Sequence, residues 1–214
     1  MMTKLKELNF QQILLFDLFN QDSISNALKE FMFYLKYSGK RGRINFALSS
    51  HNENVHHHMS IKDNYILDSV PTSLIIDRED NFSQRVENLK NEYLKELVYK
   101  TNCIDRMVGD INSQEKKLVS VVKALLSDSE YIFLDNPDNK QDIETVNIIK
   151  NAIIYEVKNH NRKVFIISEK REIWLDITTD IISRNENNQY IKTKNKLVNF
   201  KFEKPQLQLV KKAS

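Results

Sequence analysis

Residues 111–137 read INSQEKKLVSVVKALLSDSEYIFLDNP, and this stretch decides the fold class. Its first half carries apolar residues at helical spacing, which predicts a helix with one buried face. These residues are Leu118, Val121, Val122, Leu125 and Leu126. Residues 131–134 (YIFL) are apolar without alternation, as in a central strand covered on both faces, and Asp135 follows them. The stretch therefore predicts a helix that leads into a buried strand with a carboxylate at its end.

The same alternation of strand and helix continues through the chain. Residues 10–18, 43–49 and 164–168 read as further strands, and residues 143–159 read as a helix. The inward face of this helix is predicted to consist of Val146, Ile149, Ile153, Ile154 and Val157. Alternating strands and helices with buried, parallel-type strands predict an α/β lobe with a mostly parallel sheet.

A charge-rich helical region, residues 63–100, separates the second strand from the opening stretch, and residues 70–72 interrupt it. Its second part is predicted to form one amphipathic helix that packs in the core rather than forming a recognition surface. The apolar positions of this helix are Phe82, Val86, Leu89, Tyr93, Leu94 and Leu97. We expect four segments: residues 1–60 as the N-terminal part of the lobe, 61–110 as a helical subdomain, 111–204 as the C-terminal part, and 205–214 as a basic tail. Edge strands are expected from residue 189, with Val198, Phe200 and Phe202 alternating with polar residues.

Composition narrows the class of protein. The chain has 214 residues, 41% of them hydrophobic, and a net charge of +3 without a concentrated basic face, so a nucleic-acid surface is not indicated. One cysteine excludes an internal disulfide and fits a reducing cytosol. No run reaches the ~20 apolar residues that a membrane span needs. Three glycines are few for a protein that cradles phosphates with its backbone.

The layout resembles that of ATP-binding-cassette (ABC) ATPases of the transport type. In that family, the motif LSGGQ opens a helix and the next strand ends in Asp-Glu-Pro; here the two places read INSQE (residues 111–115) and DNP (135–137). Asp135 lies 23 residues after Asn112, and Glu169 lies 34 residues after Asp135, where the family keeps a switch histidine. Residues 60–67 (SIKDNYIL) also resemble a sequence motif of that family. The resemblance implies an ABC-ATPase-like, P-loop NTPase-like α/β lobe with a helical subdomain.

The phosphate-binding loop of that family, GxxxxGK[ST], has no counterpart here. The turn after the first predicted strand contains no glycine, and Lys29 lies inside the helix that follows. Residues 38–40 (SGK) are not a substitute, because Arg41 replaces the magnesium-binding Ser or Thr and Tyr34 stands where the first glycine belongs. A backbone nest for a phosphate is therefore not expected. The glutamine of the family's next loop is also missing from residues 50–59.

Other residues also differ from those of the family's catalytic motifs. Asn136 stands where the general base, Glu, belongs, and an amide does not accept a proton at a useful pKa. Glu169 replaces the histidine that contacts the γ-phosphate. Gln114 and Glu115 bring side chains and a charge into the signature motif. The positions that remain as vestiges of nucleotide binding are Asp135, Asn112, Ser113, Gln114 and Asp142. Asp135 reads either as the residue that orients a magnesium-bound water or as a cap for the next turn.

Four histidines cluster before the helical region: His51, His56, His57 and His58. Neighbouring histidines do not all point in one direction from regular structure, although a loop brings two together with an outside ligand. The pattern favours a solvated loop over a metal site.

These observations predict a pseudo-ATPase rather than an enzyme, with no cofactor and no resident metal. The resemblance implies a protein partner, either an ABC ATPase subunit in a homo- or heterodimer or a membrane permease. It also implies that the protein is located in the cytoplasm, peripheral to the inner membrane through that partner. One alternative is a divergent transporter subunit that binds ATP and Mg²⁺ through Asp135, with a base supplied by the partner. Another is a nucleic-acid-associated ABC-type protein, since SQEKKLV (113–119) resembles the head region of chromosome-maintenance ATPases, but that class needs a long coiled coil.

Overall fold

A computed structural model describes residues 12–17, 45–50, 54–69, 82–101, 103–184 and 190–198. Its strands are β1 (Gln12–Asp17), β2 (Phe46–Ser49), β3 (Tyr131–Asp135), β4 (Lys163–Ile167), β5 (Asp180–Arg184) and β6 (Tyr190–Lys194). Its α-helices are α2 (Ile61–Ser69), α3 (Phe82–Glu87), α4 (Glu92–Lys100), α5 (Ser113–Leu126) and α6 (Ile143–His160). Two short 3₁₀ helices, η2 (Val108–Asp110) and η3 (Arg171–Trp174), complete the described elements.

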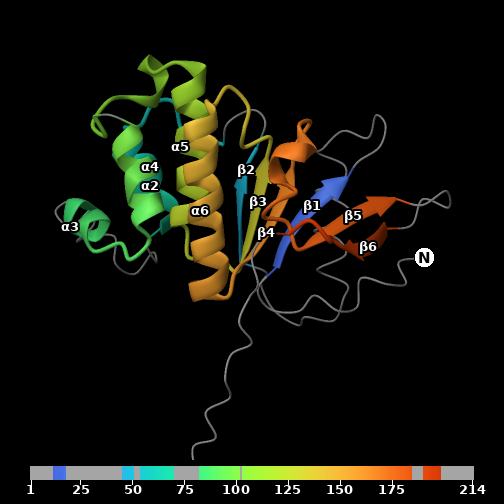
Figure 1. Cartoon of the computed structure of the whole chain (residues 1–214). Helices are drawn as coiled ribbons and strands as arrows, with labels where there is room; N and C mark the ends of the chain where they lie inside the picture. The colour runs from blue at the N-terminus through green and yellow to red at the C-terminus, as the bar shows by residue number, and fades with distance from the viewer. Residues whose placement is uncertain are drawn as a thin grey trace, which may run out of the picture.

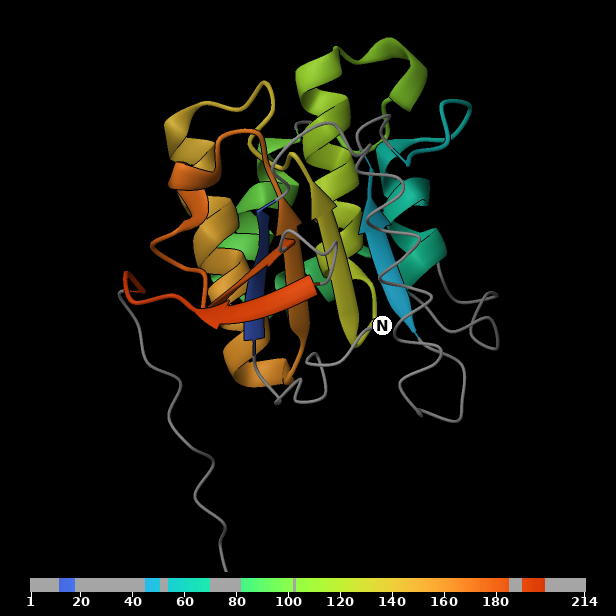
Figure 2. The ribbon, with the colours of Figure 1, turned by 90° about the vertical axis from the view of Figure 1, so that its right-hand side faces the viewer.

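The strands form one six-stranded sheet in the order β2-β3-β4-β1-β5-β6. Every neighbouring pair is parallel except β5 and β6, which are antiparallel at one edge. The predicted mostly parallel sheet is therefore confirmed. Among the described elements, the helices lie on one side of the sheet, with α5 and α6 directly against it and α2, α3 and α4 farther out (Figure 1). Figure 2 shows the sheet in front of these helices.

Successive side chains of the central strands divide between two buried layers. One layer faces the helices and joins the core around α5 and α6. It contains Ile13, Leu15, Ile132, Leu134, Val164 and Ile166. On the opposite face, Phe165 stacks on Phe133 with ring centroids 4.8 Å apart and lies 6.0 Å from Phe16. Both layers are buried, so the apolar runs in β3 and β4 contain no polar alternation because neither face meets water.

The helices that follow the predicted pattern have well-defined beginnings. Asn112 caps α5 in a capping box: its Oδ1 accepts from the Glu115 N–H at 2.9 Å, and the Glu115 carboxylate accepts from the Asn112 N–H at 3.1 Å. Asp142 caps α6, and its Oδ1 accepts from the Thr145 N–H at 2.7 Å. The inward faces of both helices are those that the helical spacing predicts, and Leu126 and Ile154 are the partly buried members.

The single helix expected over residues 82–97 is wrong. The structure breaks it into α3 and α4, and the chain turns between Glu87 and Asn91. Asn91 starts α4 because its side chain accepts from the Leu94 N–H at 3.2 Å, which satisfies an otherwise unpaired amide. The break also rotates Tyr93 outward, leaving it 43% exposed instead of on the inner face.

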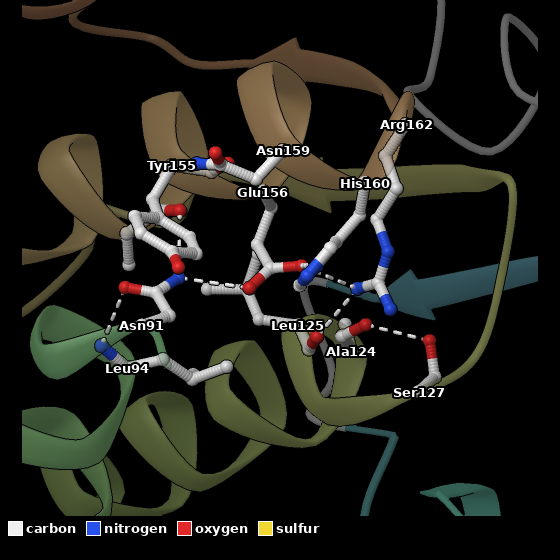
Figure 3. Close-up of polar contacts among 11 residues, drawn as sticks. Asn91, Leu94, Ala124, Leu125, Ser127, Tyr155, Glu156, Asn159, His160 and Arg162 are labelled. Atoms are coloured by element: carbon white, nitrogen blue, oxygen red, sulfur yellow. Dashed lines mark hydrogen bonds and ion pairs between the residues drawn. The ribbon is translucent and has the colours of Figure 1, made fainter. Parts of the chain in front are cut away.

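A buried carboxylate joins the beginning of α4 to the far ends of α5 and α6 (Figure 3). Glu156 accepts from Asn91 Nδ2 at 2.8 Å, lies 3.1 Å from Arg162 Nη1 and contacts His160 Nδ1 at 2.7 Å. Arg162 also donates to the Leu125 carbonyl at 2.7 Å, at the end of α5. A charge held by three partners in this way fixes the three helices relative to one another.

Several predicted features lie outside the described residues. They include the helix with Lys29, the SGK turn at 38–40, His51, Phe200, Phe202 and the basic tail at 205–214. The predicted second strand starts later than expected, at Phe46, and Val198 follows β6 outside any strand. Of the described helices, none combines the length and the apolar character that crossing a bilayer demands.

Candidate functional site at the carboxyl ends of the strands

The residues singled out by the sequence gather at the edge where the parallel strands finish, the upper end of the sheet in Figure 1. Asp135 is the last residue of β3, and Ser168 and Glu169 follow β4, its neighbour in the sheet. Ligand sites of open α/β sheets form at this edge because the loops that leave the strands converge there. This edge is therefore the expected place for a functional site.

Asn136 joins the ends of β3 and β4. Its N–H donates to the Ile167 carbonyl at 2.6 Å, and its Oδ1 accepts from the Glu169 N–H at 2.9 Å. Its Nδ2 donates to Asp135 Oδ1 at 3.0 Å. The residue has a φ of 47° and is 3% exposed. Asparagine tolerates this left-handed backbone better than most residues, and its amide both donates and accepts, as these two contacts require.

Asp138 makes a second connection between the same two loops. Its Oδ1 accepts from Ser168 Oγ at 2.6 Å and from Trp174 Nε1 at 2.9 Å. Trp174 is fully buried, and Ser168 Oγ in turn accepts from the Lys170 N–H at 3.0 Å. The carboxylate is thus surrounded by neutral donors that hold the loop after β3 against η3 and the loop after β4.

Lys117 of α5 places a positive charge at this edge of the sheet. It is the fifth residue of α5, is 2% exposed, and donates from Nζ to the main-chain carbonyl of Asp135. The same nitrogen donates to the carbonyl of Ser50, directly after β2, at 3.0 Å. A buried ammonium needs such oxygen partners, because leaving its charge unsolvated is costly.

The end of β1 carries a carboxylate that is already paired. Arg171 Nη1 lies 2.8 Å from each carboxylate oxygen of Asp17. This contact is the main reason that the pKa of Arg171 is raised above its ordinary value. Glu169, by contrast, has an exposed side chain and only its N–H is held by Asn136. The described strand ends are consequently rich in carboxylates: Asp17, Asp135, Asp138 and Glu169.

The remaining predicted residues form a second group around a pocket of about 540 Å³ at the beginnings of α5 and α6. Asn112, Gln114, Gln141 and Asp142 line it, together with Lys100 from α4. Gln141 Nε2 donates to the Gln114 carbonyl at 3.0 Å, which connects the loop after β3 to the start of α5. Ser113 is the first residue of α5 and does not line the pocket.

Both helix beginnings in this pocket are capped by the chain itself. The Asn112 side chain is committed to Glu115, and the Asp142 carboxylate is committed to Thr145. The Thr145 N–H is the main reason that the pKa of Asp142 is lowered below its ordinary value. The orphan N–H groups that bind anions at helix N-termini are therefore partly occupied by side-chain oxygens.

The structure thus brings Asp135, Asn136 and Glu169 together, and Asn112, Gln114 and Asp142 together. His56, His57 and His58 are exposed in the turn before α2, where the His56 N–H donates to Asn64 Oδ1 at 2.7 Å. Among the residues that the structure describes, no group of three or more His, Cys, Asp or Glu side chains is arranged to hold a metal ion.

Sequence reasoning missed two residues of this edge, Lys117 and Asp138. Lys117 lies four residues before Val121 and eight before Leu125, so the helical period that places those two residues in the core also places Lys117 there. A lysine in an apolar stripe is the signal that would have found it. Asp138 had no such signal, because its partner Trp174 is 36 residues away in the sequence.

Comparison with known proteins agrees with this architecture. No protein-family model matches the chain. Over 117 residues the chain is 28% identical to the ATP-binding protein Uup of Buchnera aphidicola subsp. Schizaphis graminum, a match that covers 51% of this chain and 20% of that protein. The chain therefore matches about a fifth of the length of this relative.

Solved structures give broader coverage. The ATP-binding subunit of an ABC transporter superposes with a TM-score of 0.66 at 12% identity, over 86% of this chain and 79% of that one. A dimeric bacterial ABC transporter cassette superposes with a TM-score of 0.66 at 13% identity, over 91% of this chain and 89% of that one. The chain thus has the α/β, P-loop NTPase-like fold of ABC ATPase cassettes, and the predicted fold class is confirmed.

Proposed function

We propose that this chain is a catalytically inactive ABC-type ATPase homologue, a pseudo-ATPase that serves as a structural or regulatory subunit. The observation that carries the proposal is Asn136 at the end of β3. Its amide donates to Asp135 and accepts from the Glu169 N–H, so both ends of the side chain are used in holding two loops together.

The chemistry of an amide supports this proposal. Hydrolysis of a phosphoanhydride needs a group that takes a proton from, or orients, the attacking water, and a positioned base contributes ~10²–10⁴-fold to the rate. Asn136 lacks a basic atom at neutral pH. Since the residue is also buried, its position does not change without breaking the contacts between the ends of β3 and β4.

The charges around Asn136 point the same way. Glu169 adds an exposed carboxylate after β4, and the Asp17 carboxylate at the end of β1 already holds Arg171. A magnesium nucleotide brings its own negative phosphates, which the exposed Glu169 carboxylate repels. These residues do not suit Mg-ATP, and the proposed function therefore includes no cofactor.

A subunit without turnover acts through its contacts. Solved structures that share this fold include an ATP-binding subunit of an ABC transporter and a dimeric bacterial transporter cassette. We accordingly place this chain beside an active ABC ATPase or on a membrane permease, in the cytoplasm and peripheral to the membrane through that partner. In this assembly, we assign the described helices α2, α3 and α4 to the helical subdomain expected over residues 61–110.

Calorimetric titration of Mg-ATP into the purified chain, combined with a phosphate-release assay, tests the proposal. The expected result is no turnover above a protein-free control and no binding at micromolar nucleotide. The Asn136→Glu variant serves as a second sample, because it returns the missing carboxylate, and it is expected to remain inactive. Micromolar binding with turnover by the unmodified chain would contradict the proposal.

Asp135 favours a second candidate, a divergent subunit that binds ATP without the usual motifs. This residue keeps a carboxylate at the end of β3, and the matching relative is named an ATP-binding protein. Under this candidate, the unmodified chain binds Mg-ATP and Asp135→Ala abolishes binding while its circular dichroism spectrum stays unchanged. Absence of binding by the unmodified chain removes this candidate and leaves the first.

A further inference from the structure

The buried side chain of Asn91 attaches the beginning of α4 to α6 (Figure 3). Its Nδ2 donates to Glu156 Oε1 at 2.8 Å and to the Ala152 carbonyl, one turn earlier on α6, at 3.1 Å. Its Oδ1 accepts from the Leu94 N–H at 3.2 Å and caps α4. Asn91 and Glu156 are each 2% exposed. One amide therefore both starts α4 and joins it to α6, and we call the contacts of Asn91 with Glu156 and Ala152 the latch.

The opposite end of α4 is held more loosely. Lys100 Nζ lies 3.4 Å from a carboxylate oxygen of Glu144 on α6, and the Glu144 side chain is 75% exposed. An exposed ion pair contributes little to stability, because water and salt screen it. A hydrogen bond from a buried amide to a carboxylate contributes more, since water does not replace the lost donor. Of these two polar attachments of α4 to α6, the latch is therefore the stronger.

Beyond the latch, α3 and α4 form a small unit on the outside of the helical layer (Figure 1). Helix α4 buries Leu94, Leu97 and Val98, and it packs on α5 and α6. Helix α3 packs on α4, and Phe82 at its start stacks on Tyr65 of α2 with ring centroids 6.0 Å apart. The sheet is held by hydrogen bonds among its own strands, so these bonds survive when α4 leaves α6.

The polar cluster behind the latch limits the free-energy cost of such an opening. Glu156 also contacts His160 Nδ1 at 2.7 Å and lies 3.1 Å from Arg162 Nη1. These two partners belong to α6 and to the residues just after it, so they stay with Glu156 when Asn91 leaves. The carboxylate therefore keeps its counter-charge, whose loss in a buried position would be strongly destabilising.

We propose that the latch is a conformational device that holds α3 and α4 closed on α6, and that these two helices open as one unit while the sheet stays folded. Parts of a protein that open in this way need less free energy than global unfolding does. The cluster around Glu156 lies where β4 begins, at the opposite edge of the sheet from Asp135 and Asn136, so the device does not depend on the proposed function.

Amide hydrogen exchange of the unmodified chain, followed by mass spectrometry, is the first test. We expect the amides of residues 94–98 to exchange at least tenfold faster than those of β3 and β4. Their exchange should also depend less on low concentrations of urea, because a local opening exposes less surface than global unfolding. Equal rates with equal urea dependence would mean that α4 opens only when the whole chain unfolds, and would overturn the inference.

Asn91→Asp tests the latch itself. It keeps a capping oxygen for the Leu94 N–H, but it removes the donor and turns a second carboxylate toward Glu156. Because the latch is broken in the open and the unfolded states alike, exchange at residues 94–98 and in the sheet is expected to accelerate together, by at least tenfold. Asn112→Asp, the same substitution at the exposed N-cap of α5, is the matched control and should leave exchange at residues 94–98 within twofold. Unchanged exchange in Asn91→Asp would overturn the role of the latch.

Phe133→Leu separates the local opening from global unfolding. Phe133 is buried on the face of the sheet opposite the helices, where its ring stacks on Phe165 with centroids 4.8 Å apart. Since the sheet remains folded when α4 opens, this substitution is expected to accelerate exchange in β3 and β4 by about tenfold and to leave residues 94–98 within twofold. The comparison needs no latch variant, so it decides the matter even if Asn91→Asp does not fold. Equal acceleration of both regions would contradict a separate opening of α3 and α4.

Discussion

Asn136 illustrates how one side chain can hold two loops together at the end of a sheet. Its Oδ1 accepts a hydrogen bond from the Glu169 N–H at 2.9 Å, and its Nδ2 donates one to Asp135 Oδ1 at 3.0 Å. A glutamate in this position accepts but does not donate, and it places a second carboxylate beside Asp135. The amide thus has a structural reason to be there that does not involve catalysis.

We expect Asn136→Glu to lower the free energy of unfolding by about 1–3 kcal/mol, because it removes a buried hydrogen bond and adds a like charge. Urea denaturation followed by circular dichroism measures the change. Asn139→Glu is the matched control, since it adds the same carboxylate three residues away in a partly exposed position. Equal stability of Asn136→Glu and the unmodified chain would show that the amide contacts contribute nothing.

Asp138 supplies a second prediction at the scale of single residues. Asp138→Ala leaves the Trp174 indole N–H and the Ser168 hydroxyl without their buried acceptor, and we expect a loss of about 2–3 kcal/mol. Asp138→Asn keeps an acceptor oxygen and is expected to lose less. The order of the two variants in urea denaturation is the check, and a larger loss for Asn than for Ala would contradict it.

At the scale of elements, Glu156 determines how three helices meet. Its carboxylate contacts Asn91 at the beginning of α4 and His160 in the last turn of α6, and it shares Arg162 with the end of α5. The Asn91 contact and the bond from Arg162 to the Leu125 carbonyl join different helices, whereas Glu156 and His160 lie four residues apart in α6. The cluster is the polar counterpart of the apolar contacts between α4 and α6.

Glu156→Gln is expected to lower the free energy of unfolding by about 3 kcal/mol, because a partly buried guanidinium then loses its counter-charge. Glu144→Gln is the control: that side chain pairs with Lys100 at 3.4 Å but is 75% exposed, so we expect a change below about 0.5 kcal/mol. Chemical denaturation of both variants at pH 7 compares them. Similar losses for the two would show that burial does not strengthen the Glu156 cluster.

Asp142 gives a pH-dependent prediction for the beginning of α6. The Thr145 N–H lowers the pKa of this carboxyl in the folded chain, so its stabilisation is fully present above the ordinary carboxyl pKa of about 4. It is lost as the pH falls through the lowered folded-state pKa. Asp142→Asn keeps a good cap but does not titrate. The stability difference between the unmodified chain and this variant should be constant from pH 7 to 5 and should shift toward the variant below pH 4, as measured by thermal melting.

The elements that periodicity could predict are those whose burial depends on neighbours in the sequence. Leu118, Val121 and Leu125 repeat with the helical period, and the structure places them in the core of α5. The break before α4 was missed because it depends on Asn91, whose side chain binds Glu156 and the Ala152 carbonyl from another helix. Local spacing does not contain that contact.

The candidate site was predicted only in part, for a similar reason. Asp135, Asn136 and Glu169 were found because they match the positions of motifs in the ABC family that the sequence resembles, and parallel strands bring their carboxyl ends together. Lys117 and Asp138 act through partners in other elements, at Ser50 and at Trp174. The predicted roles of Asn112 and Asp142 as remnants of nucleotide binding stay predictions, and their observed contacts are those of helix caps.

At the scale of the whole molecule, the proposed function predicts an assembly that does not respond to nucleotide. An edge that carries the exposed Glu169 carboxylate, with the Asp17 carboxylate already paired with Arg171, offers Mg-ATP no attractive place, so ATP should not join two copies. Light scattering coupled to size-exclusion chromatography is expected to give the same mass with and without 2 mM Mg-ATP. A nucleotide-dependent increase in mass would contradict this expectation.

The contact between Asp138 and Trp174 has a practical consequence. Trp174 is the one tryptophan of the sequence, and its indole N–H is bound to the loop that follows β3. Its fluorescence therefore arises from a single place, beside the strand ends, without any label. A partner that separates the loops after β3 and β4 changes the polarity around the indole and shifts its emission, so this chain carries an intrinsic optical reporter of its own binding events.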